Sequence, residues 1–205
     1  MDYFASNVQY LARSFRSGVI MISEPSRFVD SLELGRHVLL CYEEPEWARH
    51  LEFRIIENGL LEGEHCVYVS IEDSPEFIES QMEDYGIDVK GFKKKKMLHI
   101  HKVASPIDAK SDLPTIGDVL SKVPKPYRLV GRTYKLDSQK KVKANLDIEK
   151  QGSFAAAKSI MFVCSYDMGD IDLDLLRLWL PSVMKKHHDV IFAPRTGFGI
   201  GIPMR

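Results

Sequence analysis

The sequence predicts a three-layer α/β sandwich, in which a mainly parallel central sheet carries helices on both faces. Short apolar runs bounded by polar residues recur along the chain, and the segments between them place apolar side chains at helical spacing. This repeated switch is typical of βαβ units, whose connecting helices cover the faces of a parallel sheet. The expected strands lie near residues 38–42, 66–71, 97–103, 127–131, 160–165 and 190–193.

The first βαβ unit defines the pattern. Val38–Tyr42 is a short apolar run that ends at the turn Glu43-Glu44-Pro45. Apolar side chains then recur at helical spacing, and we expect Asn58-Gly59 and Gly63 to end this helix. The next strand, Cys66–Ile71, is followed directly by two carboxylates.

The later helices are expected from the same signals. Helical spacing marks the segments Ser74–Gly86, Ile116–Val123 and Leu173–Leu180, and we expect Pro181 to break the last of them. The charged segment Lys135–Gln151 permits a helix. We expect Lys93–Lys96 to form a solvated turn, and the glycine-rich tail Thr196–Gly201 to form a terminal hairpin or loop.

The composition is that of one ordinary globular domain, residues 1–205, in which residues 1–31 form an N-terminal helical extension around Val8–Phe15. A net charge of −1 gives no reason to expect nucleic acid or an acidic membrane as a partner. No signal peptide or membrane span is expected. Three cysteines, Cys41, Cys66 and Cys164, fall in predicted strands, which suggests free thiols in a reducing cytoplasm.

The turn after the first strand argues against a phosphate-binding loop. Ligands of doubly wound folds bind beyond the carboxyl ends of the strands, and a P-loop there needs glycines and a lysine. Residues 42–47 contain neither, and they carry the carboxylates of Glu43, Glu44 and Glu46. Carboxylates repel phosphate, so we expect no useful binding of ATP.

The order of these features is similar to that of two related families. The succession of a helix, Asn-Gly-Leu, Gly-Glu, a strand, the acids Glu72 and Asp73, and Ser-Pro resembles the RecA-type ATPase core of KaiC proteins. This resemblance implies a RecA-like sandwich in which the two strand-end acids include the catalytic glutamates. The position that would hold a magnesium-binding aspartate is Arg132 here.

The missing phosphate loop makes the chain more similar to the MEDS domain, the sensory domain of DcmR-type regulators, over about residues 28–192. In that family a Gly-x-His opens the first strand and a tyrosine closes it, as Gly35-Arg36-His37 and Tyr42 do here. A Cys-x-Tyr-Asp follows a late strand and a histidine precedes the last one, matching residues 164–167 and His187 or His188. The resemblance implies a degenerate RecA-like domain that senses a ligand and does not catalyse.

Three functions remain open from the sequence. The first is a sensory module that binds a small organic ligand or a signalling or regulatory protein, with no cofactor and no metal. The second is a KaiC-like assembly protein that forms homo-oligomers, or a relative of the ATPases. The third is an enzyme with a cysteine nucleophile and a histidine base; its candidates are Cys41 or Cys164 with His37, His101 or His187.

A metal site is not expected. His99 and His101 alternate with apolar residues on one predicted strand, but a metal would need at least a third ligand.

The candidate ligand site lies at the carboxyl ends of the central strands. Two tyrosines offer apolar faces with hydrogen-bonding tips, and we expect Arg132 to form an ion pair with Glu72 or Asp167. The alternative is that these residues form a closed cluster of ion pairs that only caps the sheet. The site residues are Tyr42, Glu43, Glu72, Asp73, Arg132, Tyr166 and Asp167.

Overall fold

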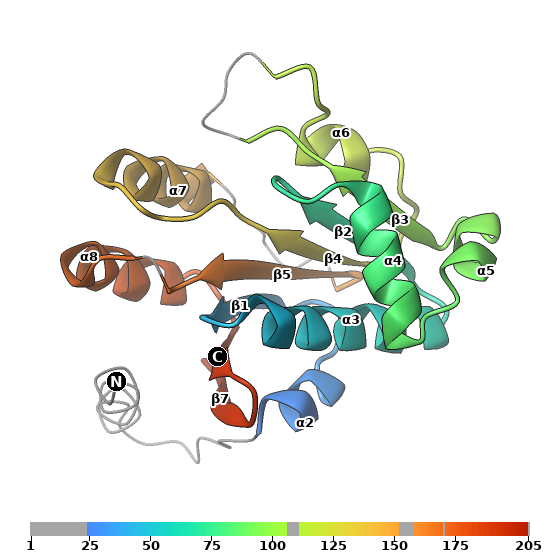
Figure 1. Ribbon diagram of the computed structural model, residues 1–205, viewed down its shortest axis with the longest axis horizontal. Helices are drawn as coiled ribbons and strands as arrows, with labels where there is room; N and C mark the ends of the chain where they lie inside the picture. The colour runs from blue at the N-terminus through green and yellow to red at the C-terminus, as the bar shows by residue number, and fades with distance from the viewer. Residues whose placement is uncertain (1–23, 106–110, 152–157, 170, 205) are drawn as a thin grey trace.

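The structure, a computed structural model, describes residues 24–105, 111–151, 158–169 and 171–204 (Figure 1). The helix expected around Val8–Phe15 lies outside the described residues. Within them, no helix is long and apolar enough to cross a membrane.

A seven-stranded sheet with the strand order β3-β2-β4-β5-β1-β6-β7 forms the centre of the fold. All neighbouring strands are parallel except β6 and β7, which are antiparallel. All six expected strands are present, so the prediction of a mainly parallel sheet is confirmed. The strands are β1 (His37–Tyr42), β2 (His65–Ser70), β3 (Leu98–Lys102), β4 (Tyr127–Arg132), β5 (Ile160–Asp167), β6 (Asp189–Arg195) and β7 (Phe198–Pro203).

Helices cover both faces of this sheet and complete a RecA-like three-layer sandwich (Figure 1). One face carries α2 (Pro25–Asp30), α3 (Pro45–Leu61), α4 (Pro75–Tyr85) and α5 (Val89–Lys94). The other face carries α6 (Ile116–Leu120), α7 (Gln139–Gln151) and α8 (Leu173–Met184). Strands β4 and β5 point toward α7 and α8 in this view.

The side chains of β1 show how one strand serves both cores. All six of its residues are buried. Val38 and Leu40 pack in the core beneath α3, whereas Leu39 and Cys41 pack in the core beneath α8. Because successive side chains of a strand point to opposite faces, a strand covered on both sides becomes a continuous apolar run.

The expected break at Pro181 was wrong. Helix α8 continues through Pro181 to Met184. Pro181 itself is exposed, but Val183 and Met184 beyond it are buried in the core. The burial of this last turn therefore outweighs the one backbone hydrogen bond that a proline removes.

The expected stop at Asn58-Gly59 was also wrong, because α3 continues to Leu61. Gly63 follows the end of this helix, as expected, and has a φ of +82° that suits glycine. A Cβ at Gly59 would lie 2.8 Å from both the Arg128 Cδ and the Cys66 Sγ. Gly59 therefore permits a close approach of α3 to the sheet.

The lysine run is only in part the expected turn, whereas the glycine-rich tail is the expected hairpin. Lys93 and Lys94 end α5, while Lys95 and Lys96 form the turn, and all four lysines are exposed. The glycine-rich tail forms a hairpin, because β7 pairs with β6.

Candidate functional site

A buried ion pair lies at the carboxyl end of β4. Arg132, which is 8% exposed, donates from Nε to the Oε1 of Glu52 at 3.3 Å, and its Nη2 lies 3.3 Å from the Oε2. Its Nη2 also donates to the carbonyl oxygen of Pro45 at 2.9 Å. The Tyr68 hydroxyl donates to the Oε2 of Glu52 at 2.7 Å, and the Tyr42 ring centroid lies 4.9 Å from the guanidinium carbon. A fully buried carboxylate is thus enclosed by its partners.

The electrostatics of this group keep Arg132 charged. Burial lowers the pKa of Arg132, but the electrostatic interactions with Glu52, Tyr68 and Tyr42 and the hydrogen bond to Glu52 together outweigh burial, and the pKa is raised. Burial also raises the pKa of Tyr42, although the nearby guanidinium opposes this. Arg132 is therefore a cation and Tyr42 a neutral phenol at neutral pH.

The expected partner of Arg132 was wrong. Its ion pair is with Glu52 of α3, and not with Glu72 or Asp167. Glu72 lies beyond the end of β2 and Asp167 is the last residue of β5, whereas Glu52 projects from the buried side of α3 toward the guanidinium. The sequence carried a signal for this, because Glu52 is a charged residue at helical spacing from the buried Ala48 and Ile55.

The remaining strand-end acids lie nearer the surface. Glu43 and Glu72 are exposed. Asp73 forms an ion pair with Arg49 at 3.2 Å, and Asp167 lies opposite Tyr42 in the register of β1 and β5. We call this surface the carboxyl edge; it consists of Tyr42, Glu43, Glu72, Asp73, Arg132 and Asp167.

Tyr166 is the one candidate residue that lies elsewhere. It faces α7 and α8, on the opposite face of the sheet from Tyr42. Its hydroxyl donates to the Oε1 of Glu149 and accepts from the Nδ2 of Asn145, both at 2.9 Å. The indole N–H of Trp179 donates to the Oδ1 of Asn145 at 2.6 Å. The structure therefore does not bring the two tyrosines into one site.

Sequence reasoning missed these polar partners of Tyr166. Asn145 and Glu149 are both buried and lie on the same side of α7 as the apolar Val142 and Leu146. A spacing of three and four residues between apolar and polar positions was the available signal.

The backbone amides after β1 are already hydrogen-bonded. The N–H groups of Glu43 and Glu44 both donate to the carbonyl oxygen of Pro194, at 3.0 and 2.8 Å. In a phosphate-binding loop such amides point at the ligand. Here they join the end of β1 to β6.

A second group of reactive side chains lies beneath α8, and we call it the thiol–imidazole cluster: His37, Cys164 and His187. The Nε2 of His37 lies 3.3 Å from the Cys164 sulfur, and the two imidazole centroids are 3.7 Å apart. Burial lowers the pKa of His37 to about 4 and that of His187 to about 3. Burial raises the pKa of the Cys164 thiol well above its ordinary value.

The protonation states of the cluster do not suit a nucleophile. A catalytic cysteine acts as a thiolate, which a neighbouring cation stabilises. Cys164 is a neutral thiol beside two neutral imidazoles at neutral pH. The other residues considered for catalysis lie apart, because His101 is on β3 and three strands separate it from Cys41 on β1.

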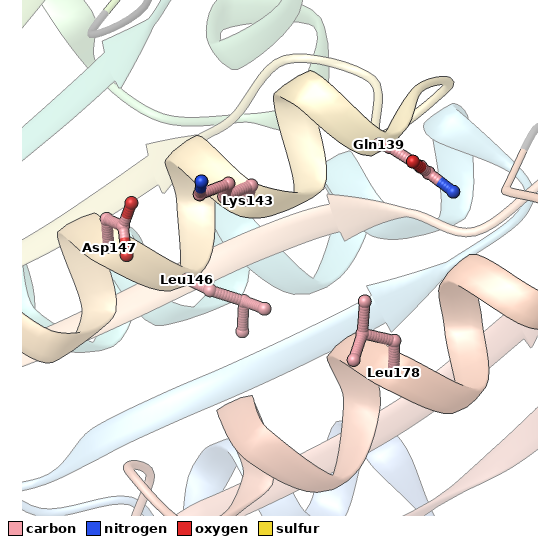
Figure 2. A pocket seen from close by; sticks show the side chains of 5 residues that line it. All are labelled: Gln139, Lys143, Leu146, Asp147 and Leu178. Carbon is pink, nitrogen blue, oxygen red and sulfur yellow. The ribbon is translucent and has the colours of Figure 1, made fainter.

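A groove with a volume of about 300 Å³ separates α7 from α8. Leu146 of α7 and Leu178 of α8 approach each other across it, and Gln139, Lys143 and Asp147 line its α7 side (Figure 2). Leu178 is 59% exposed, so an apolar side chain borders the groove at the surface. Sequence reasoning did not identify this surface.

Comparison with known proteins supports the fold. No family model and no curated protein matches the sequence. A protein of Pyrococcus horikoshii OT3 known from a structural study shares the fold with a TM-score of 0.59 and 12% identity, over 89% of this chain and 94% of that chain. A KaiC-like protein of the same hyperthermophilic archaeon has a TM-score of 0.58 and 16% identity, over 84% of this chain and 80% of that chain. The chain is therefore an α/β protein with a RecA-like sandwich fold.

Proposed function

We propose that this chain is a non-catalytic sensory domain of the MEDS type, a RecA-like domain that binds a small organic ligand in place of a nucleotide. The observation that carries the proposal is the backbone hydrogen bonding at the end of β1, which differs from that of a phosphate-binding loop. The amides of Glu43 and Glu44 are bonded to Pro194, and the next residue begins α3. In P-loop proteins the backbone N–H groups of this segment bind phosphate. Here they donate to β6 instead.

The carboxyl edge is the proposed ligand site. Glu43 and Glu72 present exposed carboxylates around a guanidinium that is buried against the Tyr42 ring. Carboxylates accept hydrogen bonds, so the edge suits a small polar molecule that carries N–H or O–H donors. Asp73 and Asp167 widen the acidic surface, and ligand binding would not require the Arg132–Glu52 pair to open.

Native mass spectrometry of the purified full chain, followed by thermal melting with a library of small amines and alcohols, tests this site. We expect at least one library compound to raise the melting temperature of the wild-type protein. Glu43→Gln and Glu72→Gln should remove that response without changing the melting temperature of the free protein, because both side chains are exposed.

The matched control is Asp84→Asn, which removes an exposed carboxylate at the far end of α4. It should leave the response intact. A response that survives both edge variants would refute the carboxyl edge as the site, and the absence of any response from the wild-type protein would contradict the sensory function.

One observation favours a second function, that of a KaiC-like protein that assembles into oligomers. Leu173 and Leu178 of α8 are 50% and 59% exposed, and Leu178 lines the α7–α8 groove. Light scattering on the wild-type protein and on Leu178→Lys tests this. Loss of an oligomer in Leu178→Lys, but not in the control Leu61→Lys on α3, would support assembly through the groove, whereas a wild-type monomer would contradict it.

A further inference from the structure

We propose that the thiol–imidazole cluster is a metal site that takes a borderline-soft divalent cation, Zn²⁺ in the first place. One ligand atom from each of His37, Cys164 and His187 lies within 4.8 Å of the other two. Imidazole nitrogen and thiolate sulfur are the donors that zinc selects. This inference does not depend on the proposed sensory function.

One pair of donors already has the spacing of two ligands on a single ion. Zinc binds nitrogen at about 2.0–2.1 Å and sulfur at about 2.3 Å, so tetrahedral donors lie roughly 3.3–3.7 Å apart. The 3.3 Å between His37 Nε2 and Cys164 Sγ falls in that range. The longest separation in the cluster is at most 4.8 Å, and a ring movement of about 1 Å would close it.

Backbone carbonyls orient both imidazoles toward the cluster. The Nδ1 of His187 lies 2.9 Å from the carbonyl oxygen of Val183, and the Nδ1 of His37 lies 3.3 Å from that of Lys186. If each Nδ1–H donates to its carbonyl, each Nε2 carries the lone pair. This arrangement is the usual second shell of metal-binding histidines.

One buried nitrogen of the cluster has no hydrogen-bond partner among the described residues. His187 is 0% exposed, and its Nε2 has no hydrogen-bond partner among the described residues. A buried acceptor without a donor is unfavourable and rare in folded proteins. A metal ion at the centre of the cluster would satisfy this nitrogen.

The charges around the cluster also suit a divalent cation. Metal binding displaces the thiol proton of Cys164 to solvent, so zinc and the thiolate together carry one positive charge. Glu149 lies on the same face, interacts electrostatically with Cys164, and leaves its buried Oε2 without a partner among the described residues. Its carboxylate would neutralise the remaining charge, which a buried site requires.

Three protein ligands leave a fourth position on a tetrahedral ion. Such positions are filled by a carboxylate, a water molecule or a bound ligand. The three ligands come from β1, from β5 and from the connection between α8 and β6, so the ion would join three segments of the chain.

The test uses the full chain, purified without chelators or metal-affinity steps. We expect about one zinc ion per chain by mass spectrometry of the metals, and removal of zinc should lower the melting temperature. Titration of the metal-free protein with Co²⁺ should give a thiolate-to-cobalt charge-transfer band that saturates at about one equivalent.

Variants identify the residues that bind the cobalt ion and give rise to the band. Cys164→Ser should abolish it, and His37→Gln and His187→Gln should weaken cobalt binding by more than about 100-fold, beyond the effect of typical second-shell changes. The controls are Cys66→Ala, a buried thiol on β2, and His50→Gln on α3, and both should bind cobalt as the wild type does. Circular dichroism shows which variants fold.

The wild-type measurements stand even if a variant does not fold. A wild-type protein that neither retains zinc nor gives the cobalt band would overturn the proposal. So would a band that persists in folded Cys164→Ser, or rapid alkylation of Cys164 by iodoacetamide that added Zn²⁺ does not slow.

Discussion

The backbone N–H of Glu44 donates to the carbonyl oxygen of Pro194 at 2.8 Å. Glu44 is also the residue before the first turn of α3, and its carboxylate accepts from the backbone N–H of Thr196 at 3.0 Å. The segment that would wrap a phosphate in a P-loop protein is therefore fixed to β6 and the turn that follows it. This relationship, together with the buried Arg132–Glu52 pair, is the basis on which we propose that the carboxyl edge does not bind a nucleotide.

The first prediction concerns the buried ion pair. Arg132→Met should lower the free energy of unfolding by about 3–5 kcal/mol, because it leaves the Glu52 carboxylate buried without its cation. Arg132→Met combined with Glu52→Leu should recover much of that loss, because both charges are then absent. Urea denaturation of the single and double variants measures the difference.

An exposed ion pair provides the control for this prediction. Arg54 pairs with Asp30 at 2.6 Å, but both side chains are more than one third exposed. Arg54→Met should therefore cost only about 0–1 kcal/mol. Equal losses from Arg132→Met and Arg54→Met would mean that the buried pair has no special role.

The second prediction concerns the glycine inside α3. Gly59→Ala should destabilise the protein by about 1–3 kcal/mol, although alanine is the better helix former, because its Cβ would lie 2.8 Å from the Arg128 Cδ and the Cys66 Sγ. Gly117→Ala in α6 is the control, since its Cβ would meet only the Thr115 Oγ1 at 3.7 Å. Thermal denaturation of both variants should show loss for Gly59→Ala alone.

The third prediction concerns the pH dependence of the metal-free protein. Burial lowers the pKa of His37 to about 4 and that of His187 to about 3. The ordinary histidine pKa of about 6.5 applies to the unfolded chain. Between pH 6.5 and the lower pKa values of the folded chain, the unfolded chain therefore binds more protons than the folded chain does. Stability is therefore complete above about pH 6.5 and falls as the pH drops, by roughly 3 kcal/mol for each histidine at pH 4.

Urea denaturation at several pH values in the presence of a chelator measures this loss. His187→Leu should reduce the slope below pH 6 by about 1.4 kcal/mol per pH unit, the value for one proton. The carboxylates titrate equally in both proteins and cancel in the comparison. Parallel stability curves for wild type and variant would show that His187 is not buried as a neutral base.

The fold was predictable from the sequence because the central strands are largely buried on both faces. The run Val38–Tyr42 is continuously apolar for that reason, and the alternation of such runs with helical spacing was sufficient to predict the sheet. The helix ends were less predictable. Gly59 and Pro181 both lie inside helices, because packing against the sheet outweighs their local preference for a helix end.

The candidate site was predictable only in part, because its assembly depends on strand register. Tyr42 lies opposite Asp167 in the pairing of β1 with β5, which places Tyr166 on the other face. A shift of one residue would have brought the two tyrosines together, and the sequence carries no signal for that register. The same register brings His37 and Cys164 together, 127 residues apart in the chain.

The central claim is that this RecA-like domain does not use its carboxyl edge to bind a nucleotide. Isothermal titration calorimetry of the full chain with ATP and Mg²⁺ tests it most directly. We predict no binding tighter than about 100 μM, because the amides after β1 are bonded to Pro194 and because this turn carries the exposed carboxylates of Glu43 and Glu44 in place of glycines and a lysine. A dissociation constant below about 100 μM, which corresponds to more than roughly 5.5 kcal/mol of binding free energy, would contradict the account.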